Sequence, residues 1–209
     1  MRLVLASNNA GKLAELQTLF APLGLDLVSQ GSLGIAEADE PHATFVENAL
    51  AKARHAALWR QGAAIADDSG LCVDALTGAP GVISAHFAGE VAAAGDREAR
   101  RRGQDAANNA LLLERMQGMP TRSARFVCTL VAVRSADDPE PLIATGRWPG
   151  RLLERPQGEG GFGYDPLLFI PALGRSVAQL DAATKNAHSH RAIASRQMLA
   201  LMREAWTSG

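Results

Sequence analysis

The sequence is poor in cysteine and aromatic residues, has almost no net charge and contains no long hydrophobic run. Its two cysteines, Cys72 and Cys128, lie among apolar residues outside any Cys-x-x-Cys pair, which predicts buried free thiols rather than a disulfide or metal site. The net charge of −1 argues against a nucleic-acid partner. No apolar run approaches the ~18 residues of a membrane span, and polar residues directly after Ala6 argue against a signal peptide. We therefore predict a cytoplasmic protein with no membrane partner.

The rest of the composition is ordinary for a globular protein. The chain has 209 residues, of which 47% are hydrophobic and 21% are charged. This length predicts one domain over residues 1–209, with one or two lobes and a sizeable core. Strand patterns alternate with helical patterns, and residues 125–134 predict a central strand that forms a hairpin with residues 141–147. The sequence thus predicts an α/β fold with a mixed sheet flanked by helices.

Two adjacent carboxylates, Asp67 and Asp68, follow a short apolar stretch that predicts a buried strand over residues 63–66. Neighbouring residues of a strand point to opposite faces, so the two carboxylates cannot enter one cavity if the strand continues. Ser69 and Gly70 predict a sharp turn here. A carboxylate at the end of a rigid strand can bind Mg²⁺ or act as a general base, whereas a solvated turn is the structural alternative.

The first strand, residues 2–6, leads through a polar loop into a predicted helix that starts near Leu13. The loop consists of Ser7, Asn8, Asn9, Ala10, Gly11 and Lys12. The backbone N–H groups at such a helix start favour an anion. Lys12 occupies a position where the helix dipole would prefer an acidic residue, which indicates a phosphate nearby. An ordinary strand-to-helix turn is the alternative.

An acidic loop precedes a long predicted helix at residues 45–60. Glu37, Asp39 and Glu40 could supply one metal ligand or be solvated. Thr44 and Glu47 fit a capping box at the helix start. Further along this helix, Lys52 could reach a phosphate or be an exposed helical lysine.

A third helix is predicted within residues 91–118, and it carries a basic cluster. The cluster consists of Arg97, Arg100, Arg101 and Arg102. No aromatic residue lies between these arginines, so we interpret them as a solvated helical face.

A loop with four glycines in six positions, residues 157–166, contains the aromatic residues Phe162 and Tyr164. Aromatic rings do not belong in a flexible linker, so the loop predicts a stacking platform for a nucleobase, or else a structural turn. The C-terminal helix is predicted at about residues 190–206, with Ser189 as its cap. Lys185 and Arg191 place cations near the start of this helix. His190 and Arg191 could also donate hydrogen bonds to the carbonyl edge of a base.

Five ordered motifs resemble the inosine/xanthosine triphosphate pyrophosphatase family (RdgB-like). They are Ser-Asn-Asn-Ala-Gly-Lys (7–12), Thr-Phe-Val-Glu-Asn-Ala (44–49), Ala-Asp-Asp-Ser-Gly-Leu (66–71), Gly-Gly-Phe-Gly-Tyr-Asp-Pro (160–166) and Lys-Asn-Ala-His-Ser-His-Arg (185–191). The resemblance covers nearly the whole chain and departs from the family pattern only around Arg97–Asp105. It implies a two-lobed fold with the active site in the cleft between the lobes, a homodimer and Mg²⁺ dependence.

The resemblance also implies roles for individual residues. Asp68 would be the proton acceptor and a Mg²⁺ ligand, with Asp39 or Glu40 as a second ligand. The residues that would bind the nucleotide are Ser7, Asn8, Asn9, Ala10, Gly11, Lys12, Lys52, Ser69, Phe162, Gly163, Tyr164, Asp165, Lys185, His190 and Arg191. The implied reaction is hydrolysis of ITP, dITP or XTP to the monophosphate and pyrophosphate. The alternatives are a Maf-like pyrimidine nucleotide pyrophosphatase and a non-catalytic nucleotide-binding module.

Overall fold

The computed structural model describes residues 2–21, 24–91 and 96–206. In these residues the chain forms a seven-stranded sheet in the order β2-β1-β3-β4-β5-β6-β7. The strands are β1 (Arg2–Leu5), β2 (Asp26–Ser29), β3 (Ala64–Val73), β4 (Ser123–Val133), β5 (Leu142–Leu152), β6 (Leu168–Ile170) and β7 (Arg175–Ser176). The α-helices are α1 (Ala10–Phe20), α2 (Phe45–Arg60), α3 (Arg97–Arg115), α4 (Ala182–His188) and α5 (His190–Trp206). Short 3₁₀ helices are η2 (Gln30–Leu33), η3 (Asp74–Leu76), η4 (Gly81–His86), η5 (Pro171–Leu173) and η6 (Val177–Gln179).

The sheet is mixed, because β1 pairs in parallel with β2 and β3, whereas β6 pairs antiparallel with β5 and β7. The predicted α/β class, the hairpin strands β4 and β5, and the helices α2 and α5 are confirmed. Helix α3 covers only the later part of the predicted helix, and residues 92–95 lie outside the described residues. No helix in the described part of the chain is long and apolar enough to cross a membrane.

The chain divides into two compact units. The first comprises Met1–Asp68, Cys128–Arg147 and His188–Gly209, and the second comprises Ser69–Val127 and Trp148–Ala187. Strands β3, β4 and β5 each continue from one unit into the other along the chain. The predicted cleft between two lobes stays a prediction.

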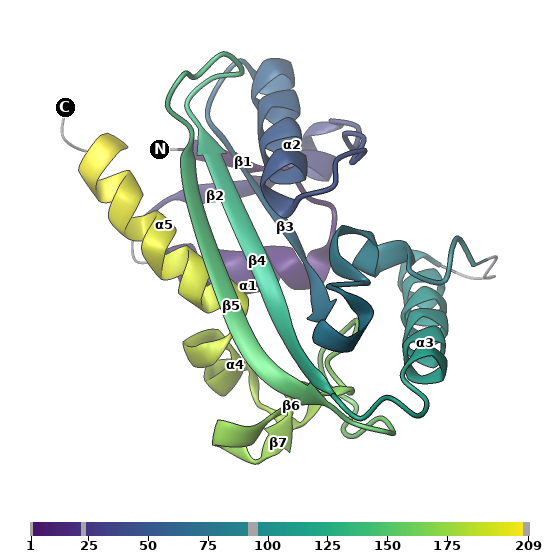
Figure 1. Cartoon of the computed structure of the whole chain (residues 1–209). Coiled ribbons are helices and arrows are strands. Elements are labelled where there is room, and N and C mark those ends of the chain that lie inside the picture. The colour runs from purple at the N-terminus through teal and green to yellow at the C-terminus, as the bar shows by residue number, and fades with distance from the viewer. Residues whose placement is uncertain (1, 22–23, 92–95, 207–209) are drawn as a thin grey trace. The chain divides into compact units, whose positions relative to one another are not determined.

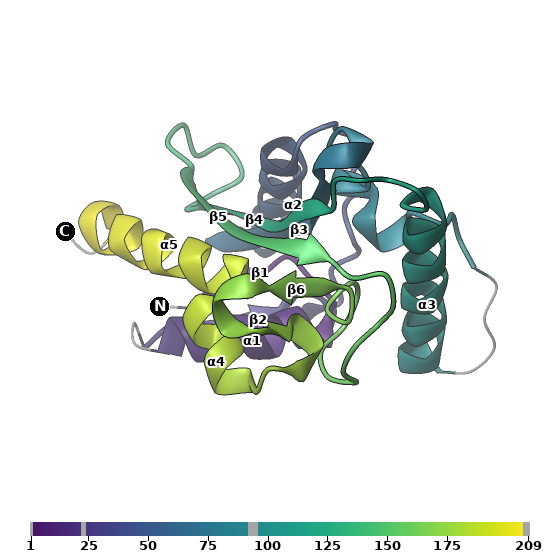
Figure 2. The ribbon, with the colours of Figure 1, turned by 60° about the horizontal axis from the view of Figure 1, so that its bottom comes forward.

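The first unit packs helices on both faces of its strands (Figure 1). One face, which includes Val4, Ala64 and Ala66, packs against the small residues of α2. The other face, which includes Leu5 and Ile65, packs against apolar residues of α1 and α5. In the turned view α2 lies above the strands and α1 below them (Figure 2). Alternate residues of each strand therefore face different helices, as the period of two requires.

The second unit has a separate apolar core. Residues of β3, β4 and β5 within this unit contribute Leu71, Phe126 and Leu152, and α3 contributes Leu112 and Met116. This core fixes the position of α3 beside the loop that precedes β6, because Tyr164 of that loop is buried in it.

Strand β3 does not end at the two aspartates, so the predicted turn at Ser69 and Gly70 is wrong. The strand runs without interruption from Ala64 to Val73. Gly70 is required for another reason: a Cβ atom there would collide with the Gly81 carbonyl oxygen and the Ser84 hydroxyl. The glycine allows a close approach of η4 to the strand rather than a change of direction.

Candidate active site

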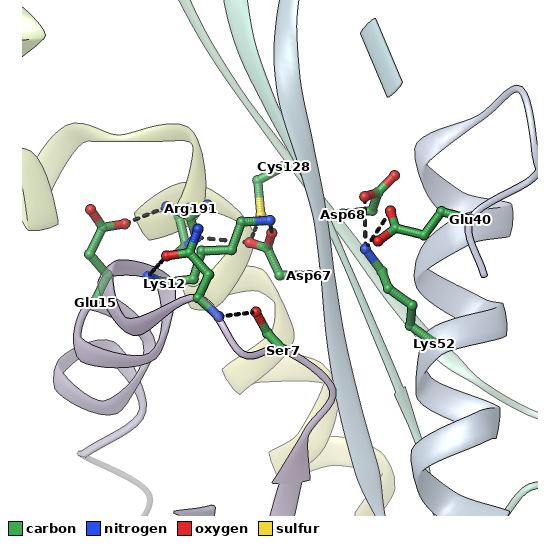
Figure 3. Close-up of polar contacts among 10 residues, drawn as sticks. Ser7, Lys12, Glu15, Glu40, Lys52, Asp67, Asp68, Cys128 and Arg191 are labelled. Atoms are coloured by element: carbon green, nitrogen blue, oxygen red, sulfur yellow. Dashed lines mark hydrogen bonds and ion pairs between the residues drawn. The ribbon is translucent and has the colours of Figure 1, made fainter. Parts of the chain in front are cut away.

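Asp67 and Asp68 point to opposite faces of β3, because the strand continues through both residues (Figure 3). Asp67 shares the face of Ile65, towards α1 and α5, and Asp68 shares the face of Ala64 and Ala66, towards α2. The prediction that the two carboxylates face different surroundings is confirmed. Each meets its own set of cations.

Asp67 is the centre of a buried polar cluster on the α1 and α5 side. Its carboxylate lies 2.5 Å from Lys12 Nζ and 2.8 Å from Arg191 Nε, and it accepts a hydrogen bond from the Cys128 thiol at 3.2 Å. Burial would raise the pKa of Asp67, but the Arg191 and Lys12 charges hold it well below its usual range. Asp67 is therefore a permanently charged anchor and not a group that exchanges protons near neutral pH.

Arg191 links this cluster to α1. Its side chain is 1% exposed, and its guanidinium also pairs with Glu15. In this structure the Arg191 guanidinium binds two carboxylates, and its predicted donation to a base edge stays a prediction. Three members of the cluster, Asp67, Glu15 and Cys128, were not predicted as site residues. Glu15 carried no sequence signal, since an acid on a surface-like helix position is common.

Asp68 meets Lys52 on the α2 side of the strand. Lys52 Nζ lies 2.8 Å from Asp68 Oδ1 and 3.0 Å from Glu40 Oε2, so one ammonium bridges the two carboxylates. Burial alone would lower the pKa of Lys52, but Asp68 and Glu40 raise it. Asp39 is exposed. Of the two predicted acidic metal ligands, Glu40 is the one whose carboxylate shares a partner with Asp68.

The pKa of Asp68 is raised to about 6, mainly by burial, although the Lys52 and Lys12 charges oppose this shift. A carboxylate that titrates near neutral pH is suited to accept a proton. Its second oxygen, Oδ2, is buried and has no hydrogen-bond partner among the described residues. An orphaned carboxylate oxygen of this kind is costly unless a ligand binds it.

The donor set at Asp68 fits Mg²⁺ better than a transition metal. Mg²⁺ prefers oxygen ligands and is commonly held by one or two carboxylates together with phosphates and waters. Asp68 Oδ2 and the neighbouring Glu40 carboxylate supply that number. The described residues contain no group of three or more His, Cys, Asp and Glu side chains placed to hold a metal. An Mg²⁺ ion held by these two carboxylates would complete its coordination with waters or phosphate oxygens, as Mg²⁺ commonly does.

The polar side chains of the predicted anion loop, Ser7–Lys12, bind other groups of the protein. Asn9 caps α1 by accepting from the Lys12 N–H at 3.0 Å, and Ser7 Oγ accepts from the Asn9 N–H at 3.2 Å. Asn8 donates to Glu37 at 2.8 Å. Ala10 and Gly11 form the first turn of α1. Lys12, which was expected to face a phosphate, faces Asp67.

In the second unit the glycine-rich loop forms a tight turn around Asp165. Asp165 Oδ2 accepts from the Phe162 N–H at 3.0 Å and from Lys185 Nζ at 2.8 Å. Tyr164 is buried and donates to the Ser84 carbonyl at 2.9 Å, so its ring is core and not a stacking platform. Phe162 is the aromatic residue of this loop that remains partly exposed.

The interpretation of the arginine cluster as a solvated face is wrong for Arg101. Its guanidinium carbon lies 4.7 Å from the centre of the Phe162 ring, and Lys185 Nζ lies 4.6 Å from the same centre. Such cation–π contacts are typical of Arg and Lys beside an aromatic ring. The sequence could not reveal the contact, because the aromatic partner comes from a loop far along the chain.

The remaining predicted residues lie at the ends of elements. Ser69 is half-buried within β3, and Gly163 follows Phe162 in the turn. His190 is buried at the start of α5, where Ser189 accepts a hydrogen bond from the Ala192 N–H at 3.1 Å and thus caps the helix as predicted. The first unit brings Lys12, Asp67 and Arg191 together on one face of β3, and Glu40, Lys52 and Asp68 together on the other face. The second unit brings together Phe162, Asp165 and Lys185.

Comparison with known proteins gives full-length matches. Residues 3–201 match the model of the Ham1 family. Proteins named dITP/XTP pyrophosphatase from Methylibium petroleiphilum and Leptothrix cholodnii are 71% and 69% identical, each over 99% of both chains. Among solved structures, a HAM1 protein from Coxiella burnetii is 40% identical with a TM-score of 0.87, and the match covers 98% of this chain and 100% of that one.

Proposed function

Because this chain belongs to the Ham1 family, we propose that it hydrolyses the non-standard purine nucleotides ITP, dITP and XTP to the monophosphate and pyrophosphate. This reaction would remove those nucleotides from the nucleotide pool. The relatives named dITP/XTP pyrophosphatase support the substrate class. The observation that carries the proposal is Asp68, a buried carboxylate with a pKa of about 6 beside Lys52 and Glu40.

The proposed chemistry assigns the proton transfer to Asp68. Its carboxylate would orient a water and accept its proton as the water attacks the α-phosphorus. Attack at this phosphorus releases pyrophosphate, whereas attack at the γ-phosphorus would release orthophosphate. Lys52, held at 2.8 Å from Asp68, places a positive charge where the phosphates would carry negative charge. Lys12 would add a second positive charge from the start of α1.

We propose that Asp68 and Glu40 hold a Mg²⁺ ion, with Asp68 Oδ2 as the oxygen that now has no donor among the described residues. When bound, the ion would neutralise charge on the triphosphate. The Lys52 ammonium would move from its bridging position towards the phosphates, because both of its carboxylate partners gain a cation. The flexible four-carbon side chain of Lys52 allows this movement.

For the second unit we propose base binding. Phe162 offers a ring for stacking, and Lys185, fixed by Asp165 at 2.8 Å, offers N–H donors to a keto oxygen. A purine with a 6-keto group would accept such a bond. Adenine, which has an amino group at that position, would leave a donor unpaired at a cost of about 1–3 kcal/mol.

We further propose a cytoplasmic homodimer. Cys72 and Cys128 are buried and form no disulfide, which suits a reducing compartment. Leu58 and Trp59 on α2 are 66% and 65% exposed, and neighbouring exposed apolar side chains favour an interface. A mass measurement in solution tests the dimer, which a monomer at micromolar concentration would contradict.

The experiment that tests the function is a panel of nucleotides with Mg²⁺, scored for pyrophosphate and orthophosphate separately. We expect pyrophosphate from ITP, dITP and XTP and little product from ATP, GTP, UTP and dTTP. Preference for UTP or dTTP would favour a Maf-like pyrimidine enzyme instead. Tight nucleotide binding without pyrophosphate release would favour a non-catalytic module.

A further inference from the structure

One stripe of α3 contacts the loop that carries Phe162. Arg101, Asp105 and Asn109 are spaced four residues apart, so their side chains lie on one face of the helix. Asp105 Oδ2 accepts from the Gly163 N–H at 2.9 Å, and Asn109 Nδ2 donates to the Gly163 carbonyl at 3.0 Å. Helix α3 therefore binds both polar groups of one glycine.

The conformation of that glycine sets the course of the backbone directly after Phe162. Gly163 has a φ of +61°, in the left-handed region, and directly follows Phe162. Within the turn, the Phe162 N–H donates to Asp165 Oδ2 at 3.0 Å and the Asp165 N–H donates to the Phe162 carbonyl at 3.2 Å. The backbone on both sides of the ring is thus fixed by hydrogen bonds.

These anchors matter because the loop is rich in glycine. Glycine loses more backbone freedom on ordering than other residues, so residues 158–163 are costly to hold in one conformation. The apolar core buries Tyr164 but not Phe162. Besides the cation–π contacts of Arg101 and Lys185 with the ring, polar contacts of the backbone order this turn, and α3 supplies the two on Gly163.

We propose that Asp105 and Asn109 are positioning residues for the nucleotide base, because they hold the Phe162–Gly163 turn in the conformation that presents the ring for stacking. This inference rests on the proposed function, since it assumes that Phe162 binds the base. If the ring is ordered before the nucleotide binds, no binding free energy is lost to ordering it. Loss of either contact should weaken nucleotide binding without changing the reaction at the phosphate.

A reciprocal pair of substitutions tests the proposal with no change in side-chain shape. Asp105→Asn keeps an oxygen that can accept from the Gly163 N–H, so its KM for ITP should stay within about threefold of the wild type. Asn109→Asp replaces the donor to the Gly163 carbonyl with an oxygen, so its KM should rise about tenfold with kcat within twofold. Asp105→Ala should behave like Asn109→Asp. Glu98→Ala, which removes an exposed acid of the same helix, is the matched control.

Hydrogen exchange of the Gly163 amide gives a readout that does not depend on activity. It should accelerate at least tenfold in Asp105→Ala and stay near the wild-type rate in Asp105→Asn. An unchanged KM in both Asp105→Ala and Asn109→Asp, with an active wild-type enzyme, would overturn this inference alone. Equal loss of kcat in every variant would show a merely structural role and overturn it too. A wild-type protein inactive on ITP would overturn the proposed function and with it this inference.

Discussion

The Lys12 ammonium lies 2.5 Å from the Asp67 carboxylate, on the other side of β3 from Asp68. The two adjacent carboxylates therefore lie in different electrostatic environments. Asp67 is surrounded by cations that keep it charged, whereas Asp68 is buried with a raised pKa. Asp67 is thus a charged anchor on one face of β3, and Asp68 is a titrating group on the other face.

Asp67→Asn should destabilise the protein strongly. The substitution removes the carboxylate between Lys12 and Arg191, and breaking a buried ion pair by removing one partner costs about 3–5 kcal/mol. The folded-state pKa of Asp67 lies below its usual value of 3.8, so its contribution is complete above pH 3.8 and disappears as the pH falls further. Urea unfolding at pH 7 measures the loss.

The exposed pair of Arg2 and Asp26, at 2.7 Å, provides the control for this measurement. Asp26→Asn removes a carboxylate from an ion pair of similar length at the surface, where the expected loss is about 1 kcal/mol or less. If Asp67→Asn cost no more than Asp26→Asn, the anchoring role of Asp67 would be refuted.

Asp68→Asn should have the opposite effect on stability and a large effect on rate. The pKa of Asp68 is raised from 3.8 to about 6 in the folded protein. The protonated side chain therefore contributes stability to the folded protein that is complete below pH 3.8 and is lost as the pH rises through about 6. At pH 7.5 the charged carboxylate therefore costs stability, and asparagine should recover about 1–3 kcal/mol in the absence of Mg²⁺. The kcat for ITP should fall about 10²- to 10⁴-fold.

The pH profile separates these two effects. The gain in stability of Asp68→Asn should shrink below pH 6 and vanish near pH 3.8, because both proteins then carry a neutral side chain. An Asp68→Asn enzyme that retained near full kcat would rule out Asp68 as the base.

The strand pattern made part of this site predictable. The period of two correctly separated Asp67 from Asp68, and the helices bearing Lys12 and Lys52 were found from apolar spacing and a cap. What the pattern could not provide was the partner of each cation. Lys12 at a helix start predicts a phosphate nearby, which stays a prediction; in this structure its partner is Asp67, from a strand remote in sequence.

Errors arose where long-range contacts decide the role of a residue. Gly70 resembles a turn glycine locally, but it is required because Gly81 and Ser84 approach β3. Tyr164 and Phe162 look equivalent in the sequence, yet only Tyr164 reaches the apolar core. Local propensity carries no information on such packing, which depends on elements that meet only after folding.

Removal of Mg²⁺ should abolish pyrophosphate release. Substitutions of two neighbouring acids, Glu40 and Asp39, should change the Mg²⁺ requirement by different amounts. Glu40→Gln should raise the Mg²⁺ concentration needed for half-maximal activity about tenfold or more, because Glu40 shares Lys52 with Asp68. Asp39→Asn, which removes the same charge from an exposed position, should leave the Mg²⁺ concentration for half-maximal activity within twofold of the wild type. A titration of activity with MgCl₂ measures both. The reverse order would make Asp39 the metal ligand.

Arg101→Ala should lower the KM for ITP. The guanidinium carbon lies 4.7 Å from the centre of the Phe162 ring, so a base that stacks on the same face would have to displace it. A cation–π contact at a partly exposed site is worth about 0.5–1 kcal/mol, which corresponds to a two- to fivefold lower KM with unchanged kcat.

Arg100→Ala provides the control, because it removes an equal charge from an exposed arginine of the same helix and should change neither constant. In a Phe162→Leu background the effect of Arg101→Ala should disappear, because the ring that both groups compete for is gone. A higher KM in Arg101→Ala would mean instead that the arginine stacks on the bound base.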